Sequence, residues 1–321
     1  MVRDQELETF KTQIDLREYA AECGYVWDRQ ESWRGSAVMR KDGDKIIIKR
    51  DGDGHYVYFS VKSDRDSGSI IDFVQVRKRL TLGEVRKELR PWLGRSGGAS
   101  PTPFPRLEPT ARNRVAVEAE YRRMQDADRH PYLEEKRLIP ADVLMSPRFA
   151  GRVRMDRRGN AVFPHFDEEG LCGYELKNTG YTGFSKGGAK GLWFSRTGAD
   201  DRRLVIAESA IDALSYAALF PDELTRYASI GGQLNPRQPE LIRAAAARLP
   251  RGAEVVAAMD ADDAGVALSA MVEEAVRLTG REDLASIVHT PLEGKDWNDV
   301  LKARQTSSLP TARPDPFPGV C

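Results

Sequence analysis

Between residues 203 and 304, short apolar segments alternate with segments of helix length, and this alternation constrains the fold more than any other feature of the chain. The apolar segments, rich in Val, Ile and Ala, are expected to be strands at 203–207, 225–230, 254–259 and 284–289. Helices are expected at 210–220, 239–249 and 264–278. Parallel strands need crossover connections, which are usually helices. The pattern therefore predicts an α/β fold, a parallel sheet with covering helices.

Acidic residues follow two of these apolar segments. Glu208 and Asp212 come after the first, and Asp260 and Asp262 come after the third. Because the carboxyl ends of parallel strands meet at the edge where open α/β sheets bind ligands, we expect these carboxylates to converge. Converging carboxylates repel one another unless a cation is present, and oxygen ligands without a His or Cys cluster favour Mg²⁺ or Mn²⁺. For Glu208 and Asp212, the alternative is a structural role at a helix N-terminus.

The order of these residues resembles the TOPRIM fold of bacterial primases, type IA and II topoisomerases and some nucleases. The finer resemblance is to bacterial DNA primases, which carry a Glu-Gly-x-x-Asp strand end, a Phe-Asp-Gly-Asp-x-Ala-Gly loop and a Gly-Lys-Asp-Pro-Asp loop. The matching segments here are 208–212, 259–265 and 294–299. The resemblance implies that Glu208, Asp260 and Asp262 are catalytic, and that these three and Asp212 bind the metal. A calcium loop is excluded, because Ala264 and Met271 stand where an EF-hand needs oxygen ligands.

The same resemblance implies a set of substrate-binding residues. Lys186 lies in a Gly-rich loop at 183–191 and Arg196 follows it, where primases carry basic residues that face nucleotide phosphates or the template. Gly231 and Gly232 occupy the place of a small-residue loop near the primase active site. Lys295 and Asp296 belong to the third motif, and we expect them to contact substrate as well. The alternatives are solubilising surface residues for the basic side chains and a simple turn for the glycines.

A Gly-, Ser- and Pro-rich stretch at 95–112 is predicted to be a linker. It separates a small N-terminal α+β domain at 1–94 from a primase-like α+β subdomain at 113–202, the TOPRIM domain at 203–304 and a flexible tail at 305–321. The first domain resembles the zinc-binding domain of bacterial primases. The only cysteine and histidine in this domain are Cys23 and His55. A structural zinc needs four ligands, so we expect no zinc. An unrelated α+β domain is the alternative. Tyr56 and Tyr58 alternate on a predicted strand and could stack bases or pack in the core.

Composition narrows the classes of function. Lys plus Arg and Asp plus Glu both number 49, and a neutral total does not exclude nucleic acid because charge can be patterned. No apolar run is long enough for a membrane span, and the N-terminal segment lacks the apolar core of a signal peptide. The three cysteines are isolated, which fits a cytoplasmic protein. No phosphate-binding loop of an NTPase occurs, so a fused helicase motor is excluded.

These features together predict a template-dependent DNA primase, a nucleotidyltransferase that uses Mg²⁺ or Mn²⁺, nucleoside triphosphates and a single-stranded DNA template. A separate replicative helicase is an expected partner. The short length and the missing zinc ligands suggest a plasmid or mobile-element protein. Two alternatives stay open: a TOPRIM nuclease, and a non-catalytic nucleic-acid-binding accessory protein of plasmid replication or mobilisation. Phe163, Pro164 and Lys186 favour the primase over the nuclease, because nucleases usually lack this region.

Overall fold

The structure is a computed structural model that describes residues 4–52, 54–61, 66–94, 104–109, 111–232, 234–235 and 237–307. The chain divides into two compact units. The first comprises Met1–Arg123 and Leu171–Lys190, and the second comprises Met124–Gly170 and Gly191–Cys321. Within the described ranges, no helix combines the length and the hydrophobicity that a membrane span requires.

The first unit contains an antiparallel sheet in the order β1-β2-β3-β4-β5. Its strands are β1 (Val26–Trp33), β2 (Ser36–Lys41), β3 (Asp44–Arg50), β4 (Tyr56–Ser60) and β5 (Ser67–Ser69). Its helices are α1 (Gln5–Gln13), α2 (Leu16–Glu22), α3 (Ile70–Lys78), α4 (Leu82–Leu89), the 3-10 turn η1 (Arg90–Trp92) and α5 (Arg114–Arg122). A hairpin of β9 (Gly170–Asn178) and β10 (Tyr181–Phe184) completes the elements. The strand that was predicted to carry Tyr56 and Tyr58 is β4, whereas β1 and β2 were not predicted.

The core of the first unit lies between this sheet and helices α1 to α4. Tyr58 is fully buried there and packs edge-on against Phe73, so of the two roles considered for Tyr58 the structure shows core packing. Phe104 and Leu107 are buried in the same core. They belong to the segment predicted as a linker, and the described part of that segment therefore contributes apolar side chains to the unit. The sequence signal was misleading because Pro and Gly mark an irregular backbone, and such a backbone can still carry buried side chains.

The second unit begins with a small antiparallel arrangement of β6 (Gln125–Asp126), β7 (Arg154–Met155) and β8 (Ala161–Asp167). The π-helical turn η3 (Tyr132–Lys136) and helix α6 (Ala141–Met145) lie between β6 and β7 in sequence. The remaining strands are β11 (Trp193–Phe194), β12 (Arg203–Ala207), β13 (Thr225–Ser229), β14 (Glu254–Ala258) and β15 (Ala285–Val288). The remaining helices are α7 (Ala210–Leu219), α8 (Gln238–Ala247), α9 (Asp263–Arg277) and α10 (Trp297–Ser307).

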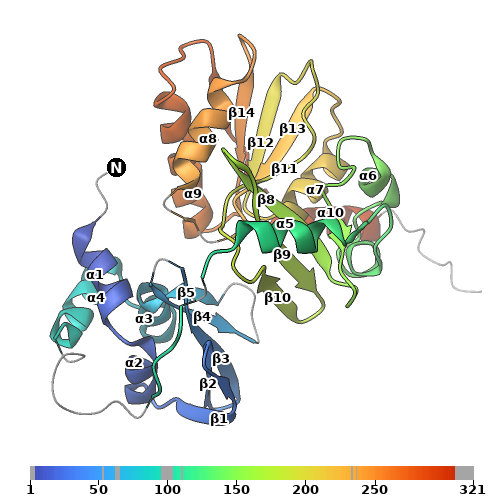
Figure 1. The fold of residues 1–321 in the computed structure, drawn as a ribbon. Coiled ribbons are helices and arrows are strands. Elements are labelled where there is room, and N and C mark those ends of the chain that lie inside the picture. Colours follow the sequence, from blue (N-terminus) through green and yellow to red (C-terminus); the bar gives the residue numbers. More distant parts are fainter. Residues whose placement is uncertain are drawn as a thin grey trace, which may run out of the picture. The chain divides into compact units, whose positions relative to one another are not determined.

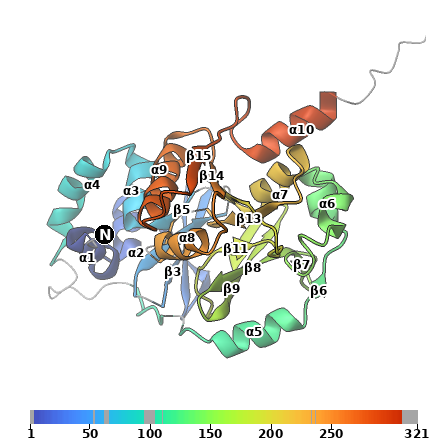
Figure 2. The ribbon, with the colours of Figure 1, turned by 90° about the horizontal axis from the view of Figure 1, so that it is seen from above.

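The main sheet of the second unit has the order β11-β13-β12-β14-β15. Strands β12 to β15 are parallel, and β11 pairs with β13 in the antiparallel direction. One core joins the sheet to α7 and α10, and a second core joins the opposite face to α8 and α9 (Figures 1 and 2). Residues of β12 are buried on both faces, which explains its unbroken apolar sequence. The predicted α/β fold, a parallel sheet with covering helices, is confirmed.

Candidate functional site

Glu208 and Asp260 lie at the carboxyl edge of two adjacent parallel strands. Strand β12 ends at Ala207, which is paired in register with Ala258, the last residue of β14. Glu208 follows β12 directly, and Asp260 comes two residues after the end of β14. Asp260 is buried and Glu208 is partly exposed. The structure therefore brings these two predicted carboxylates to one edge, as the strand pattern indicated.

Backbone hydrogen bonds join the loops at this edge. The amide of Gly232 donates to the carbonyl oxygen of Glu208 at 2.8 Å, and the amide of Ala261 donates to the carbonyl oxygen of Lys295 at 2.9 Å. Gly231 has φ +68° and Gly232 has φ +77°, a left-handed conformation that favours glycine. The loops that follow β12, β13 and β14 thus meet the loop that precedes α10, so Gly231, Gly232 and Lys295 lie at the same edge as Glu208.

Asp212 occupies the first turn of α7 and is buried. Its Oδ2 accepts a hydrogen bond from the Ser209 hydroxyl at 2.6 Å, and its Oδ1 accepts one from the backbone amide of Asn298 at 3.3 Å. Asn298 is buried too, and its side-chain Nδ2 donates to the carbonyl oxygen of Arg137 at 2.7 Å and to the Ser215 hydroxyl at 3.0 Å. Asp212 therefore connects α7 to the start of α10, which supports the alternative of a structural role at a helix N-terminus.

Asp262 is the N-cap of α9, and its carboxylate accepts a hydrogen bond from the Gly265 amide at 2.9 Å. Gly265 packs tightly against the loop before it, because a Cβ atom at this position would lie 1.9 Å from the carbonyl oxygen of Asp260. In the loop at 294–299, Oδ1 of Asp296 accepts a hydrogen bond from the backbone amide of Asp299 at 2.7 Å. Asp262 and Asp296 thus cap the chain locally, as acids near helix N-termini often do.

Among the described residues, no group of three or more His, Cys, Asp or Glu side chains has the arrangement that could hold a metal ion. The donors at the carboxyl edge are all oxygen atoms, which fits Mg²⁺ or Mn²⁺ in chemical type. Glu208 and Asp260 follow neighbouring strands at this edge, whereas Asp212 and Asp262 make hydrogen bonds to helix N-terminal groups. Metal binding by these four residues therefore stays a prediction.

The two basic residues that were predicted to contact substrate lie in different places. Lys186 belongs to the first unit, where its Nζ is 5.8 Å from the ring centroid of the exposed Trp33. Arg196 belongs to the second unit and follows β11, with its Nε donating to the carbonyl oxygen of Ala150 at 2.7 Å. Because β11 runs antiparallel to β13, the chain at Arg196 has moved away from the carboxyl edge. The structure therefore does not bring Arg196 to Glu208 and Asp260.

An aromatic cluster near the loop at 294–299 was not predicted from the sequence. The ring of His289, just after β15, packs on Trp297 with centroids 4.7 Å apart, and its Nδ1 lies 2.8 Å from the Tyr216 hydroxyl. Burial lowers the pKa of His289 from its ordinary value, and burial raises the pKa of Tyr216. Trp297 also donates from Nε1 to the carbonyl oxygen of Ala258 at 3.1 Å, so this cluster anchors the start of α10 beside the end of β14. Isolated aromatic residues in separate segments gave no signal for it.

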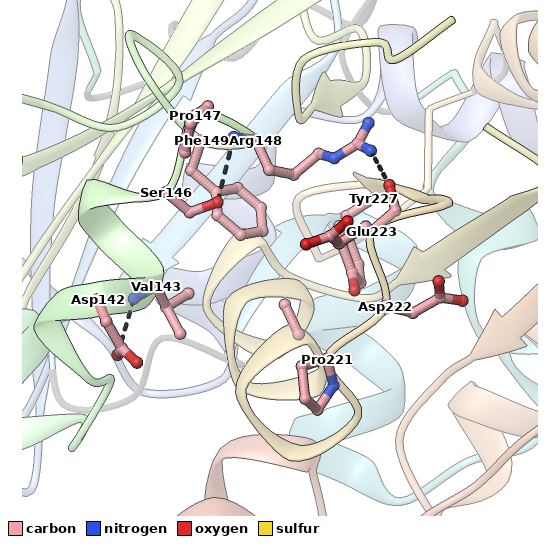
Figure 3. A pocket seen from close by; sticks show the side chains of 11 residues that line it. Asp142, Val143, Ser146, Pro147, Arg148, Phe149, Pro221, Asp222, Glu223 and Tyr227 are labelled. Atoms are coloured by element: carbon pink, nitrogen blue, oxygen red, sulfur yellow. Dashed lines mark hydrogen bonds between the residues drawn. The ribbon is translucent and has the colours of Figure 1, made fainter. Parts of the chain in front are cut away.

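A pocket of about 600 Å³ is lined by residues of α6, α7 and β13 and of the segments after α6 and before β13 (Figure 3). Arg148 lies at this pocket, with its guanidinium donating to the carbonyl oxygen of Glu223 and forming an ion pair with Asp201. Tyr227 of β13 and the loop before β13 line it, so the pocket is separate from the carboxyl edge. Its lining residues are Asp142, Val143, Ser146, Pro147, Arg148, Phe149, Ala217, Pro221, Asp222, Glu223 and Tyr227.

Two solved structures resemble parts of this chain. A DNA primase domain from Pseudomonas aeruginosa matches with a TM-score of 0.35 and 14% identity, over 51% of this chain and 54% of that domain, about half its length. A chain from a bacteriophage T7 complex of the lagging-strand DNA polymerase with primase domains, an RNA/DNA hybrid and dTTP matches with a TM-score of 0.34 and 16% identity, over 54% of this chain and 85% of that chain. Both TM-scores are too low to establish a shared fold. No curated protein matches the sequence.

Two family models match successive parts of the chain. Residues 131–201 match a family described as a protein of unknown function, DUF3991. Residues 205–301 match the family described as Toprim-like. The second match begins within β12 and ends within α10, so it covers the four parallel strands, helices α7, α8 and α9, and the loops that carry Glu208 and Asp260. By sequence and by fold, residues 205–301 of this chain form a Toprim-like domain.

Proposed function

We propose that this protein is a template-dependent DNA primase that joins nucleoside triphosphates on single-stranded DNA with the help of Mg²⁺ or Mn²⁺. The observation that carries the proposal is the position of Glu208 and Asp260 after two paired parallel strands of a Toprim-like domain. Two carboxylates at such an edge form a place where a cation and a phosphate-bearing substrate can meet. A separate helicase would supply the single strand, and a plasmid or mobile element is the proposed setting.

In this reaction the 3′-hydroxyl of the growing strand attacks the α-phosphorus of the incoming nucleotide, a new P–O bond forms and pyrophosphate leaves. A bound divalent cation supplies charge neutralisation and a lower pKa for the attacking hydroxyl. Glu208 and Asp260 would hold that cation, with Asp212 and Asp262 contributing through their negative charge. Lys295, exposed in the adjoining loop, would attract the phosphates. The backbone at Gly231 and Gly232 carries no side chain, so a nucleotide can approach it closely.

A second candidate is a non-catalytic nucleic-acid-binding accessory protein. One observation favours it: Asp212 and Asp262 are engaged in capping hydrogen bonds, and the described residues contain no ready cluster of three metal-binding side chains. A Toprim fold kept for binding alone would look like this. The nuclease alternative is supported by the same two carboxylates, because metal-dependent hydrolysis uses similar ligands.

The test incubates the full chain with single-stranded DNA, labelled nucleoside triphosphates and Mg²⁺ or Mn²⁺, and then resolves the products by length. Short labelled products support the primase, a shortened template supports the nuclease, and neither supports the accessory protein. Asp260→Asn is expected to abolish synthesis because it removes a ligand charge. Glu273→Gln, which changes an exposed acid of α9, is the matched control and is expected to leave synthesis unchanged. Near wild-type synthesis by Asp260→Asn would contradict the proposed metal site.

A further inference from the structure

Arg226 of β13 is an arginine with an unusual environment. Its guanidinium carbon lies 4.3 Å from the ring centroid of Phe194 in the paired strand β11. Its Nε is buried and has no hydrogen-bond partner among the described residues. None of the described carboxylates lies within ion-pair distance of its guanidinium. Burial lowers the pKa of Arg226 from its ordinary value. An arginine that is partly desolvated without a partner is costly unless an anion is bound in the functional state.

Two further arginines lie close enough to Arg226 for their charges to act on it. The guanidinium of Arg152 lies 4.6 Å from the ring centroid of Phe166. Phe166 forms a β-bridge with Leu192, which places it two residues from Phe194 along the neighbouring strand. Arg248, at the end of α8, is exposed. The charges of Arg152 and Arg248 both act on Arg226 and lower its pKa further, after the larger effect of burial.

The acidic residue that acts on Arg226 is already engaged. Asp201 is buried, and its Oδ1 lies 2.7 Å from the Arg148 guanidinium while its Oδ2 accepts from the Gly198 amide at 2.7 Å. It therefore offsets the charge of Arg148 more directly than that of Arg226. We call Arg226, Arg152 and Arg248 the arginine cluster; among the described residues, neither Arg226 nor Arg248 forms an ion pair with a carboxylate.

Guanidinium groups match the geometry of phosphate oxygens and can bind them with two parallel hydrogen bonds, so the arginine cluster fits a phosphate group. The rings of Phe166 and Phe194 are partly exposed, and each packs against one guanidinium, that of Arg152 and that of Arg226 respectively. Arginines interleaved with aromatic rings are typical of surfaces that bind single-stranded nucleic acid, where the rings offer stacking faces and the arginines contact the backbone.

We propose that the arginine cluster, with Phe166 and Phe194, binds a backbone phosphate of a single-stranded nucleic acid away from the carboxyl edge. Arg226 lies three residues before Ser229, the end of β13, or about 10 Å along the strand. A nucleic-acid strand carries a phosphate at every nucleotide, so one strand can reach both places. The choice of nucleic acid as the ligand rests on the proposed function, whereas the phosphate chemistry rests on the cluster itself.

The test measures binding of a fluorescein-labelled oligothymidylate to the full chain at several salt concentrations, with a chelator present so that catalysis and metal binding play no part. Arg226→Gln is expected to weaken binding by roughly tenfold, the effect of one charge-assisted contact. It should also reduce the slope of log affinity against log salt by about 0.7, the value for one phosphate contact on a single strand. Arg248→Gln should change both quantities in the same direction.

Arg243→Gln is the matched control, because Arg243 lies on the same helix as Arg248 and forms a surface ion pair with Glu240. It should bind like wild type. ATP and inorganic phosphate serve as competitors: weak competition by both supports a strand, and displacement of the oligothymidylate by a low concentration of ATP overturns the strand and assigns a nucleotide. Wild-type affinity and salt slope in Arg226→Gln would overturn the site. Asp260→Asn should still bind the strand, so failure of the primase proposal and failure of this site give different results.

Discussion

Gly265→Ala tests the geometry that holds Asp260 at the sheet edge. In an ordinary helix this change is stabilising, because alanine has a higher helix propensity than glycine by about 1 kcal/mol. Here a Cβ atom would lie 1.9 Å from the carbonyl oxygen of Asp260, whereas ordinary contact begins near 3.4 Å. The first turn of α9 and the loop at Asp260 would have to separate by about 1.5 Å, the difference between these two distances.

The atom that meets the new Cβ belongs to the backbone, so no side-chain rotation can relieve the contact. Forcing extra atoms into a packed region costs about 1–3 kcal/mol, and the propensity gain offsets only part of that. We therefore expect Gly265→Ala to lower the free energy of unfolding by up to about 2 kcal/mol. Because Asp260 must move, primer synthesis should fall as well.

The assay combines urea unfolding with hydrogen exchange of the α9 and β14 amides. Hydrogen exchange reports on this region by itself, which matters because a chain with two units need not unfold in one step. Gly83→Ala is the matched control, since Gly83 also lies in the first turn of a helix and nothing lies within 4 Å of its missing Cβ. It should be neutral or stabilising. If Gly265→Ala protects the α9 amides as well as wild type does, the close-contact argument is refuted.

Three further predictions concern Asp262, His130 and the zinc content of the protein. Asp262→Ala should destabilise the protein by about 1 kcal/mol through loss of the α9 cap, whereas Asp262→Asn keeps a good cap, so a synthesis defect with normal urea unfolding in the Asn variant would separate metal binding from capping. His130 is buried and its pKa is lowered by burial, so the unfolded chain takes up a proton below about pH 6.5 that the folded chain does not. The free energy of unfolding should therefore fall as pH drops from 7 to 5. A His130→Gln variant with the same pH slope would contradict this. Elemental analysis should find less than stoichiometric zinc. Residues 1–94 contain one cysteine, Cys23, and one histidine, His55, whose Nε2 lies 3.0 Å from the carboxylate of Glu8. Tightly bound zinc would overturn the zinc-less interpretation.

The sequence was sufficient to predict most elements of the Toprim-like domain, but helix α10 (Trp297–Ser307) was not predicted and extends into the segment predicted as a tail. The expected strand at 254–259 is β14 (Glu254–Ala258), and the expected helix at 264–278 is α9 (Asp263–Arg277). These predictions succeeded because apolar runs and helix caps are local signals that adjoining residues carry themselves. The placement of Glu208 and Asp260 at one edge followed from the same pattern, since parallel strands put their carboxyl ends together. By contrast, β1 (Val26–Trp33) escaped prediction, because most of its side chains are polar and exposed.

Only the tertiary structure decided how these elements use their side chains. The antiparallel direction of β11 carries Arg196 away from the acidic edge and sets Phe194 against Arg226, and no local pattern encodes the direction of an edge strand. The contact between Asp212 and Asn298 joins residues far apart in the chain, so it became visible only once α7 and α10 were packed together. The residue types and their order determined that acids would gather at the sheet edge. Which of those acids contacts a distant helix, and which aromatic ring Arg226 packs on, depends on long-range packing, because these contacts are made by segments that meet only in the folded protein.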